Sequence, residues 1–553
     1  MPTITLNRKV FDVLVGKKLP LEKLKDRISM LGTDLEEVND KEIIVEVFPN
    51  RPDMLSVQGF ARAFSSFIGA KTGLRHYKVE PSKEKMIVEK SVAEVRPYTA
   101  CAIVKNLHFD DEKIREVIDI QEKLHITYGR NRKKVAIGIY PFEKIKTPIK
   151  FIAQDPEDIV FQPLEFNKKM NALEILEKHP AGRAYGRLLH GKKKFPVFRD
   201  ADNEVLSVPP IINSHNTGKI NEKTKDIFIE CSGFDFNFLQ KCLNIIVTAL
   251  DEMGGKVYSM ELYYGNKKYV TPDLRPEEMK VDLNYINKLL GLSLSENEIK
   301  KLFEKMGYGY NNKKALIPAY RADILHQMDL AEDIAIAYGY ENFESIVPNV
   351  STVAQEDKFE ILKAKISQLL VGLGFIETST YHLTNKEFQC KKMNADAQLI
   401  ELANSISSDY NVLRSWVIPS LMEILSNNKH HEYPQRIFAI GTIFNKNDKT
   451  ETNIGENDRL AVAIASEDTD YTEIKQILDY LFRSLNLKYE ITETEHNSFI
   501  QGRAARVAVN GKKVAYIGEL NPKVITNWSL EVPVTAFEMN LTGLFESMGK
   551  NKL

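Results

Sequence analysis

The sequence of 553 residues has few cysteines and no long apolar run. Its four cysteines include no CxxC pair, so neither a structural zinc site nor a disulfide framework is expected. No apolar stretch approaches the ~20 residues that cross a bilayer. The N-terminal segment also lacks the apolar core of a signal peptide. We therefore expect a cytoplasmic protein without membrane segments.

An excess of positive charge is absent as well, because 75 Lys and Arg residues are balanced by 76 Asp and Glu residues. A protein whose whole surface binds nucleic acid is usually basic, so any RNA contact must come from local patches. The tract GRNRKK at 129–134 is one such patch. It could contact phosphates, and a solvated surface loop is the simpler alternative.

Common catalytic and phosphate-binding signatures are missing too. The chain contains no GxxxxGKS/T loop, no GxGxxG after a strand, no HExxH and no GxSxG. The HIGH and KMSK-type signatures of class I synthetases are also absent. We conclude that this chain by itself forms no complete ATP site of a familiar kind.

The length predicts several domains, because a single hydrophobic core stops growing well below 553 residues. Periodicity predicts an α+β multidomain protein: a small α/β unit, alternating strands and helices, a helical unit, and an antiparallel sheet with helices. The expected boundaries give domains at residues 1–82, 83–268, 269–347 and 348–553. The polar segment 81–85 is interpreted as a linker, and the segment 266–268 as the next domain boundary.

A segment with helical periodicity carries the clearest cluster of chemical side chains. Asp329, Glu332 and Asp333 stand at positions i, i+3 and i+4, so three carboxylates share one helical face. Asp323 can approach from the preceding turn. Hard oxygen ligands of this kind suit Mg²⁺. An acidic first turn that favours the helix dipole is the structural alternative, and spacing alone favours that alternative.

A second group of polar residues follows two predicted strands. Asn213 and Ser214 end the segment VPPIINS, and Asp235 ends the segment SGFD. Side chains at strand ends commonly line pockets, where these residues could hold an adenosine, an amino group or an attacking water. Ordinary turns are the alternative, since the same residue types are frequent in turns.

Taken together, these segments resemble one family, the phenylalanyl-tRNA synthetase β subunit of the archaeal and eukaryotic cytosolic type. The resemblance rests on the tracts FPNRPDMLS at 48–56, HPAGRAYG at 179–186, VPPIINS at 208–214 and RADILHQMDLAEDIAIAYGY at 321–340. It covers essentially the whole chain, in family order. The length resembles the short form, without the OB-fold and anticodon-binding domains of the bacterial subunit.

The resemblance implies a subunit of phenylalanine–tRNA ligase that works in an (αβ)2 heterotetramer with an α subunit and tRNA(Phe). The α subunit would hold the aminoacylation site and consume ATP. In this chain, residues 83–268 would be the B3/B4 domain that hydrolyses Tyr-tRNA(Phe), with Asn213, Ser214 and Asp235 in its editing pocket. Residues 269–347 would be the B5 domain, whose Mg²⁺ ligands fall on Asp323, Asp329, Glu332 and Asp333. The α subunit could complete the surroundings of that Mg²⁺.

Residues 348–553 resemble a class II synthetase module that has lost its chemistry. Working modules present Arg and Glu on the second motif, where this chain has Ala439 and Ile440. We therefore expect no catalytic residues for aminoacylation here. A further departure is Phe234, where relatives have a small hydroxyl residue, and its ring is expected to narrow the editing pocket or abolish editing.

Two other functions fit the same sequence. One is a noncatalytic RNA-binding or scaffold protein that keeps the fold, and the other is a freestanding hydrolase of mischarged tRNA. Ester hydrolysis by the chain alone would favour the hydrolase. A lack of activity in every combination with an α subunit would favour the scaffold.

Overall fold

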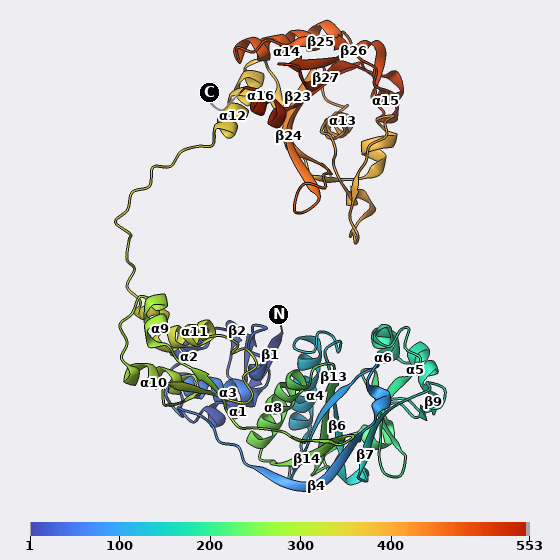
Figure 1. Cartoon of the computed structure of the whole chain (residues 1–553). Helices are drawn as coiled ribbons and strands as arrows, with labels where there is room; N and C mark the ends of the chain where they lie inside the picture. The colour runs from blue at the N-terminus through green and yellow to red at the C-terminus, as the bar shows by residue number, and fades with distance from the viewer. Residues whose placement is uncertain (1, 549–553) are drawn as a thin grey trace. The chain divides into compact units, whose positions relative to one another are not determined.

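The computed structural model of the protein describes residues 2–548. The chain forms two compact units, Met1–Val347 and Pro348–Leu553, called unit 1 and unit 2 below (Figure 1). Among the described residues, no helix is long and apolar enough to cross a membrane.

Unit 1 begins with a small antiparallel sheet in the order β1-β3-β2, flanked by helices. The elements are β1 (Thr3–Asn7), α1 (Arg8–Val15), α2 (Leu21–Met30), β2 (Asp34–Val38), β3 (Glu42–Glu46) and α3 (Val57–Phe67). The Asn7 side chain caps α1, and Gly16 ends that helix in the left-handed conformation, at φ +74°. The predicted helix from Met54 begins three residues later, because Pro52–Met54 forms a 3-10 turn before the Ser56 cap.

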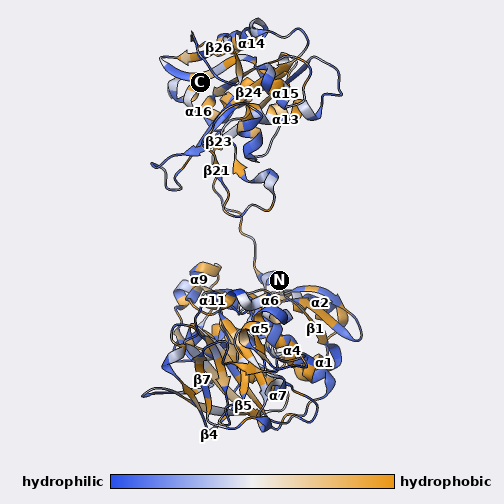
Figure 2. Ribbon diagram, turned by 90° about the vertical axis from the view of Figure 1, so that its right-hand side faces the viewer, coloured by the Kyte–Doolittle hydropathy of each residue, from blue (hydrophilic) through white to orange (hydrophobic). Residues whose placement is uncertain are grey.

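A ten-stranded mixed sheet occupies most of unit 1, in the order β12-β11-β10-β7-β4-β14-β5-β13-β6, with β15 paired to β14. Its strands are β4 (Val79–Val88), β5 (Tyr98–Lys105), β6 (Val135–Pro141), β7 (Ile149–Gln154), β10 (Phe195–Arg199), β11 (Val205–Val208), β12 (Ile212–Asn213), β13 (Ile227–Gly233), β14 (Lys256–Tyr264) and β15 (Lys267–Thr271). The hydropathy colouring shows how apolar the strands of unit 1 are (Figure 2).

Two helices pack on the face of this sheet that carries the alternate residues Ile227, Ile229 and Cys231 of β13. They are α4 (Asp111–Ile126) and α8 (Phe236–Glu252). The intervening Phe228 belongs to a different core, on the opposite face. A strand with apolar side chains on both faces lies in the interior of a sheet.

Residues 81–85, interpreted as a linker, and residues 266–268, interpreted as a domain boundary, are parts of this sheet, so the linker interpretation of 81–85 is wrong. Residues 81–85 lie within β4, which pairs in parallel with β14. Residues 266–268 form the turn between β14 and β15 and the first residues of β15. Their polar composition suggested a linker and a boundary, but backbone pairing with neighbouring strands determines a strand as strongly as side-chain hydropathy does.

The last part of unit 1 combines helices with a small sheet in the order β16-β18-β17, which the helical interpretation of residues 269–347 did not include. Its elements are β16 (Glu277–Lys280), α9 (Leu283–Leu290), α10 (Glu296–Lys305), β17 (Gly309–Asn311), β18 (Lys314–Ile317) and α11 (Gln327–Tyr338). A capping box of Ser295 and Glu298 begins α10. Apolar residues of this part share one continuous core with α3 and α8.

Unit 2 is built on a seven-stranded sheet in the order β19-β23-β24-β28-β27-β26-β25. These strands are β19 (Ile376–Glu377), β23 (Gln435–Lys446), β24 (Ile454–Ala465), β25 (Glu490–Glu493), β26 (Phe499–Val509), β27 (Lys512–Leu520) and β28 (Val534–Asn540). Helices α12 (Lys358–Gly372), α14 (Tyr471–Ser484) and α16 (Leu541–Met548) share a core with one face. Helices α13 (Ile418–Asn427) and α15 (Pro522–Asn527) pack on the other. The predicted mainly antiparallel sheet with helices is confirmed, β19 being its one parallel strand.

Largely buried ion pairs lie within and between the parts of unit 1. Arg321, 2% exposed at its side chain, bonds to Asp323 at 2.7 Å and Asp333 at 2.8 Å. In α3, Arg62 bonds to Glu252 of α8 at 3.2 Å and stacks on Tyr320 at 3.7 Å. Each of these carboxylates is thus compensated inside the unit by a guanidinium.

Removing the central guanidinium should therefore destabilise unit 1. Arg321→Leu leaves two buried carboxylates without their cation, and we expect a loss of about 3–5 kcal/mol in the free energy of unfolding. Urea unfolding followed by circular dichroism measures this loss. The control Arg115→Ala removes an exposed pair with Asp111 and should change stability by less than about 1 kcal/mol. Equal stability of the two variants would contradict the assigned role of Arg321.

Candidate functional site

A cavity of about 390 Å³ lies beside the large sheet, between α4, β6 and the segment that follows β11. Its walls are largely apolar, with Ile114 and Ile118 from α4 and Ile137 and Ile139 from β6. Neighbouring strands contribute three polar residues: Ser207 of β11, Asn213 of β12 and Glu230 of β13. Helix α4 and the adjoining loops contribute the others, which are Gln121, Glu122, His125, Arg132, Glu165, His215 and Lys219. An apolar cavity with a few convergent polar groups is the usual form of a small-molecule site.

The chain reversal after β11 places Asn213 in this cavity. The N–H of Ile211 donates to the carbonyl of Val208 at 2.8 Å, closing a turn through two prolines. The chain then returns as β12, in which Asn213 lies opposite Ser207. Proline supplies the fixed φ that such a turn needs, so the position of Asn213 follows from the tract VPPIIN.

A hydrogen-bonded group of buried polar side chains lies at the inner end of the cavity. The Tyr140 hydroxyl is 2.8 Å from Ser207 Oγ, 3.2 Å from Glu230 Oε1 and 3.5 Å from Asn213 Oδ1. Glu230 is 1% exposed, and its Oε2 has no hydrogen-bond partner by distance and angle among the described residues. A buried polar atom of this kind favours a ligand that can bond to it.

Burial also sets the charge of Glu230. It raises the pKa of this carboxyl to about 8, although Arg96, Tyr140 and Ser232 act in the opposite direction. At neutral pH the group is therefore mainly the uncharged acid, which can both donate and accept a hydrogen bond. The cavity consequently presents a neutral polar end to a ligand.

Glycine at position 138 leaves room for this arrangement. A Cβ there would lie 2.1 Å from the Tyr140 hydroxyl oxygen and 2.6 Å from Glu230 Oε1. Both distances are far below van der Waals contact. Any side chain on this residue of β6 would displace the polar group.

Arg132 connects the segments that form the wall of the cavity. It donates to the carbonyl of Ile211 at 3.0 Å and to Glu122 of α4 at 2.8 Å, and its guanidinium stacks on Tyr185 at 4.2 Å. Glu122 also contacts His125 Nδ1 at 3.1 Å, and burial lowers the pKa of this histidine. The basic tract 129–134 thus has one member with a structural role at the cavity.

Of the three predicted editing residues, only Asn213 lines the cavity. Asp235 caps α8, accepting from the N–H of Phe238 at 3.1 Å. Ser214 is buried beyond the lining and donates its N–H to the carbonyl of Leu206. The Phe234 ring is 53% exposed, lies over Arg96 and is not part of the cavity wall, so it does not narrow this cavity as expected.

Sequence analysis missed Glu230, Tyr140 and Ser207. A signal for Glu230 was present, because it is the single charged residue in the apolar tract IFIEC of β13. A carboxylate that interrupts a buried strand requires either a partner or a function. Tyr140 and Ser207 gave no such signal, since they become neighbours only when β6 and β11 are brought around the cavity.

The four predicted metal ligands lie near one another at the start of α11, but two are occupied by Arg321. Asp323 accepts from it through both oxygens, and Asp333 accepts from it and from the Tyr308 hydroxyl. Asp329 Oδ2 accepts the backbone N–H groups of Leu325 and His326, in a capping box. Each of these three carboxylates therefore has a structural partner.

Glu332 is the remaining carboxylate and is exposed. Partial burial and the nearby charges of Asp333, Asp329 and Asp323 raise its pKa, so negative charge remains uncompensated at this surface. Within residues 2–548, no group of three or more His, Cys, Asp or Glu side chains is arranged to hold a metal ion. The four residues thus do not fit a four-ligand site as they stand, and their role in binding Mg²⁺ stays a prediction.

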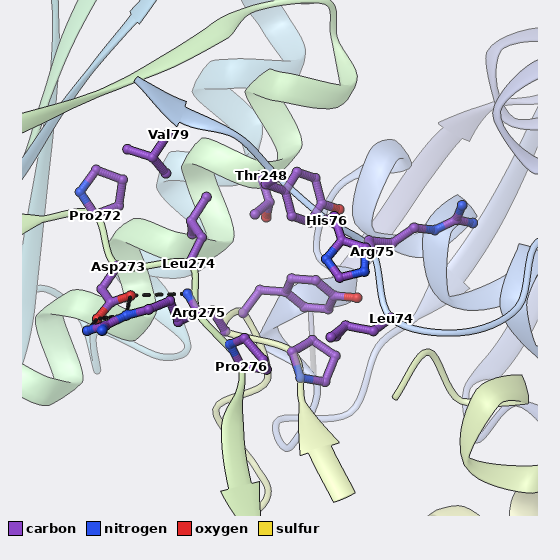
Figure 3. A pocket seen from close by; sticks show the side chains of 14 residues that line it. Leu74, Arg75, His76, Val79, Thr248, Pro272, Asp273, Leu274, Arg275 and Pro276 are labelled. Atoms are coloured by element: carbon purple, nitrogen blue, oxygen red, sulfur yellow. Dashed lines mark hydrogen bonds and ion pairs between the residues drawn. The ribbon is translucent and has the colours of Figure 1, made fainter. Parts of the chain in front are cut away.

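A second cavity in unit 1, of about 340 Å³, offers less chemistry. Aromatic and proline side chains line it, including Tyr77, Pro272 and Tyr320. Figure 3 shows Arg275 bonded to Asp273 at its edge, at 2.5 Å in the closest pair. One of its two arginines is thus neutralised within the cavity wall, and the other, Arg75, donates to the backbone carbonyl of Lys71.

In unit 2, buried charged side chains form hydrogen bonds within the protein. Arg414 is 2% exposed and donates to the carbonyl of Thr442 and to Thr380 Oγ1. Its guanidinium occupies the space above Gly441, where a Cβ would lie 2.1 Å from Nη2. Glu538 of β28 accepts the N–H groups of Val417 and Ile418 at the start of α13.

Comparison with known proteins agrees with this architecture. Residues 103–242 match the "B3/4 domain", residues 279–340 the "tRNA synthetase B5 domain", and residues 343–541 the "Phenylalanyl tRNA synthetase beta chain CLM domain". A crystal structure of an N-terminal fragment of the phenylalanyl-tRNA synthetase β subunit from Pyrococcus horikoshii is similar, with a TM-score of 0.58 and 39% identity. The match covers 61% of this chain and 99% of that fragment.

Full-length relatives extend the similarity over both units. The phenylalanine–tRNA ligase β subunit of Pyrococcus abyssi is 42% identical, over 99% of this chain and 100% of the relative. That of Archaeoglobus fulgidus is 38% identical over 99% of each chain. The chain therefore belongs to the phenylalanine–tRNA ligase β-subunit family.

Proposed function

We propose that this chain is one subunit of a cytoplasmic phenylalanine–tRNA ligase, active in an (αβ)2 heterotetramer with an α subunit and tRNA(Phe). The full-length similarity to β subunits supports this assignment. The holoenzyme joins phenylalanine to tRNA(Phe), with ATP converted to AMP and pyrophosphate. In unit 2, Arg414 and Glu538 are buried and committed to backbone and side-chain partners, which fits a module without catalytic residues of its own.

The first test is charging of tRNA(Phe) with phenylalanine. We expect no charging by this chain alone and full charging when the α subunit from the same genome is added, because the catalytic groups come from α. The measurement is incorporation of labelled phenylalanine into tRNA. If a folded mixture does not charge intact tRNA while this chain alone hydrolyses mischarged tRNA, the freestanding hydrolase is the correct function. Failure of both reactions would favour the scaffold.

We further propose that the 390 Å³ cavity hydrolyses tyrosine from mischarged tRNA(Phe). The observation that carries this proposal is the neutral, incompletely bonded carboxyl of Glu230 at its inner end. A tyrosyl side chain that enters the cavity can donate its phenol proton to Glu230 Oε2. A phenylalanyl side chain cannot, and would leave this buried oxygen without a partner.

The ester bond then lies toward the open side of the cavity, where water can attack its carbonyl carbon. Hydrolysis breaks the bond between the carbonyl carbon and the ribose oxygen, releasing tyrosine and tRNA(Phe). Asn213 can orient the aminoacyl group by hydrogen bonding. Positioning of this kind is the main contribution that a site without an evident general base can make.

Glu230 gives a direct test of discrimination. With Glu230→Ala, we expect hydrolysis of Tyr-tRNA(Phe) to fall about 10- to 100-fold in kcat/KM, equivalent to the loss of one or two buried hydrogen bonds. With Glu230→Gln, hydrolysis should stay within about 3-fold, since the amide oxygen also accepts a phenol proton. The assay is deacylation by the complex with α.

Charging with phenylalanine serves as the control for folding, because neither substitution touches the aminoacylation site. The matched control variant is Asp235→Asn, which keeps the cap of α8 and should retain editing. Loss of editing in this variant with normal activity in Glu230→Ala would overturn the choice of the cavity carboxylate.

We propose that Mg²⁺ binds beside α11 through Asp329 and Glu332 and keeps most of its water ligands. Partial burial and then the neighbouring charges of Asp333 and Asp329 raise the pKa of Glu332, and a cation would offset the repulsion among these carboxylates. Magnesium commonly uses one or two protein carboxylates and several waters. Asp323 and Asp333 would then act indirectly, since Arg321 holds them.

Calorimetric titration of the complex with MgCl2 tests this site. Glu332→Gln should weaken binding about 10-fold or more, because it removes one of two charged ligands. The control Glu344→Gln removes an exposed carboxylate in the same unit and should bind Mg²⁺ like the wild type. Unchanged binding by Glu332→Gln would refute the two-carboxylate site.

A further inference from the structure

Exposed cations lie next to the cavity that holds Glu230. Arg130, Lys133 and Lys134 belong to the loop between α4 and β6, and Lys219 lines the cavity from the segment after β12. We call these four residues the cationic rim. In the described part of the chain, no acidic side chain pairs with any of them within ion-pair distance. Unpaired cations beside a cavity favour an anionic ligand.

The loop of the cationic rim has a defined conformation. Arg130, Asn131 and Arg132 have φ values of 49°, 52° and 63°, in the left-handed region. This conformation costs roughly 1 kcal/mol or more for each residue other than glycine. Successive left-handed residues are therefore retained only where other contacts determine them.

Backbone hydrogen bonds to the end of α4 provide those contacts. The N–H of Asn131 donates to the carbonyl of Ile126 at 3.2 Å, and the N–H of Arg132 donates to that of His125 at 3.1 Å. In the same loop, the Arg132 side chain is held by hydrogen bonds to Glu122 and to the Ile211 carbonyl. The exposed cations thus belong to a rigid loop, and Arg132 of the same loop is part of the cavity wall.

The distribution of charge also separates the rim from the cavity. Inside, Glu230 is neutral at pH 7, and Glu122 is bonded to Arg132. At the edge, Glu165 is the one exposed carboxylate among the lining residues without an ion-pair partner. Of the rim residues only Lys219 also lines the cavity, and the Lys134 ammonium lies over the Phe238 ring of α8. The positive charge beside the edge therefore comes mainly from the exposed Arg130 and Lys133 of the adjoining loop.

We propose that the cationic rim binds the phosphodiesters of a single-stranded RNA 3′ end whose terminal aminoacyl group enters the cavity. A cavity of about 390 Å³ can take an amino-acid side chain and part of a ribose, but no duplex. The negative groups nearest to that aminoacyl group are the terminal phosphodiesters, so cations are needed at the edge. This inference rests on the proposed editing function and identifies the residues that position its substrate.

The test uses Arg130→Ala/Lys133→Ala in the complex with α, because both side chains are exposed and neither lines the cavity. We expect KM for Tyr-tRNA(Phe) deacylation to rise about 10-fold with kcat unchanged. The slope of log(kcat/KM) against log[salt] should become shallower by about 0.7 for each lost phosphate contact.

The matched control is Lys90→Ala/Lys267→Ala, which removes the same charge from exposed sites that do not line the cavity, in the 3-10 turn after β4 and in β15. It should leave KM and the salt slope unchanged. The proposal is wrong if the rim variant has the KM and salt slope of the wild type, or if the control variant changes as much as the rim variant.

A substrate without phosphodiesters distinguishes this proposal from the editing proposal. The rim variant should hydrolyse 3′-tyrosyl-adenosine at the wild-type rate, whereas Glu230→Ala should not. Equal impairment of the rim variant on both substrates would show that it disturbs the cavity, and would overturn the positioning role.

If the wild type hydrolyses neither substrate, the editing proposal fails, and the rim is tested by binding alone. A 5′-labelled oligonucleotide ending in CCA should bind the rim variant about 10-fold more weakly by fluorescence anisotropy. Equal binding would overturn the proposal. Displacement of the oligonucleotide from the wild type by polyglutamate at equal charge concentration would also overturn it, and would indicate an acidic protein partner.

Discussion

The pairing of β13 between β5 and β6 determines where the candidate site forms. Every residue of β13 is buried, and both of its edges are hydrogen-bonded in register, from Ile227 to Gly233. A strand held in this way cannot slip, because a shift by one residue would exchange its two faces. Alternation along the strand then sends Ile229 toward α8 and turns Glu230 to the opposite face, beside Tyr140. The chemistry of the cavity follows from this register.

Burial explains why one carboxyl in this protein differs from the others. Within residues 2–548, no guanidinium forms an ion pair with Glu230, and burial favours its neutral form more than the charge of Arg96 opposes it. Asp323 and Asp333 are largely buried as well, but Arg321 compensates their charge. The same residue type thus gives a neutral hydrogen-bonding group in one place and a structural ion pair in another. The difference lies in whether an arginine from a distant part of the chain reaches the carboxylate.

The two units use charged residues in different ways. In unit 1, a neutral polar end, a rigid cationic loop and an acidic surface beside α11 are each available to a ligand. In unit 2, Arg414 and Glu538 are buried and bonded within the sheet and at the start of α13. This contrast agrees with a subunit in which unit 1 acts on RNA and unit 2 has no catalytic residues of its own, as proposed above.

The sequence by itself determined the family, the α+β architecture and most of the helices. Family tracts such as VPPIINS and RADILHQMD can be identified from the order of residues alone. Helix periodicity and caps are likewise local properties of the sequence. The sequence also located the acidic cluster. It did not predict which carboxylates Arg321 would bond to, because an arginine can pair with a carboxylate that is near or distant in sequence. Segment 81–85 was misread because strand pairing is not local.

Only the tertiary structure decided which polar residues meet in the cavity. Asn213, predicted from the end of the tract VPPIINS and from the family resemblance, lines the cavity. Asp235 caps α8, and the Phe234 side chain is exposed. Tyr140, Ser207 and Glu230 lie on three strands that are distant in sequence, and their contact depends on sheet order and register. Local patterns contain no information about that order, because it results from the packing of the whole sheet against its helices.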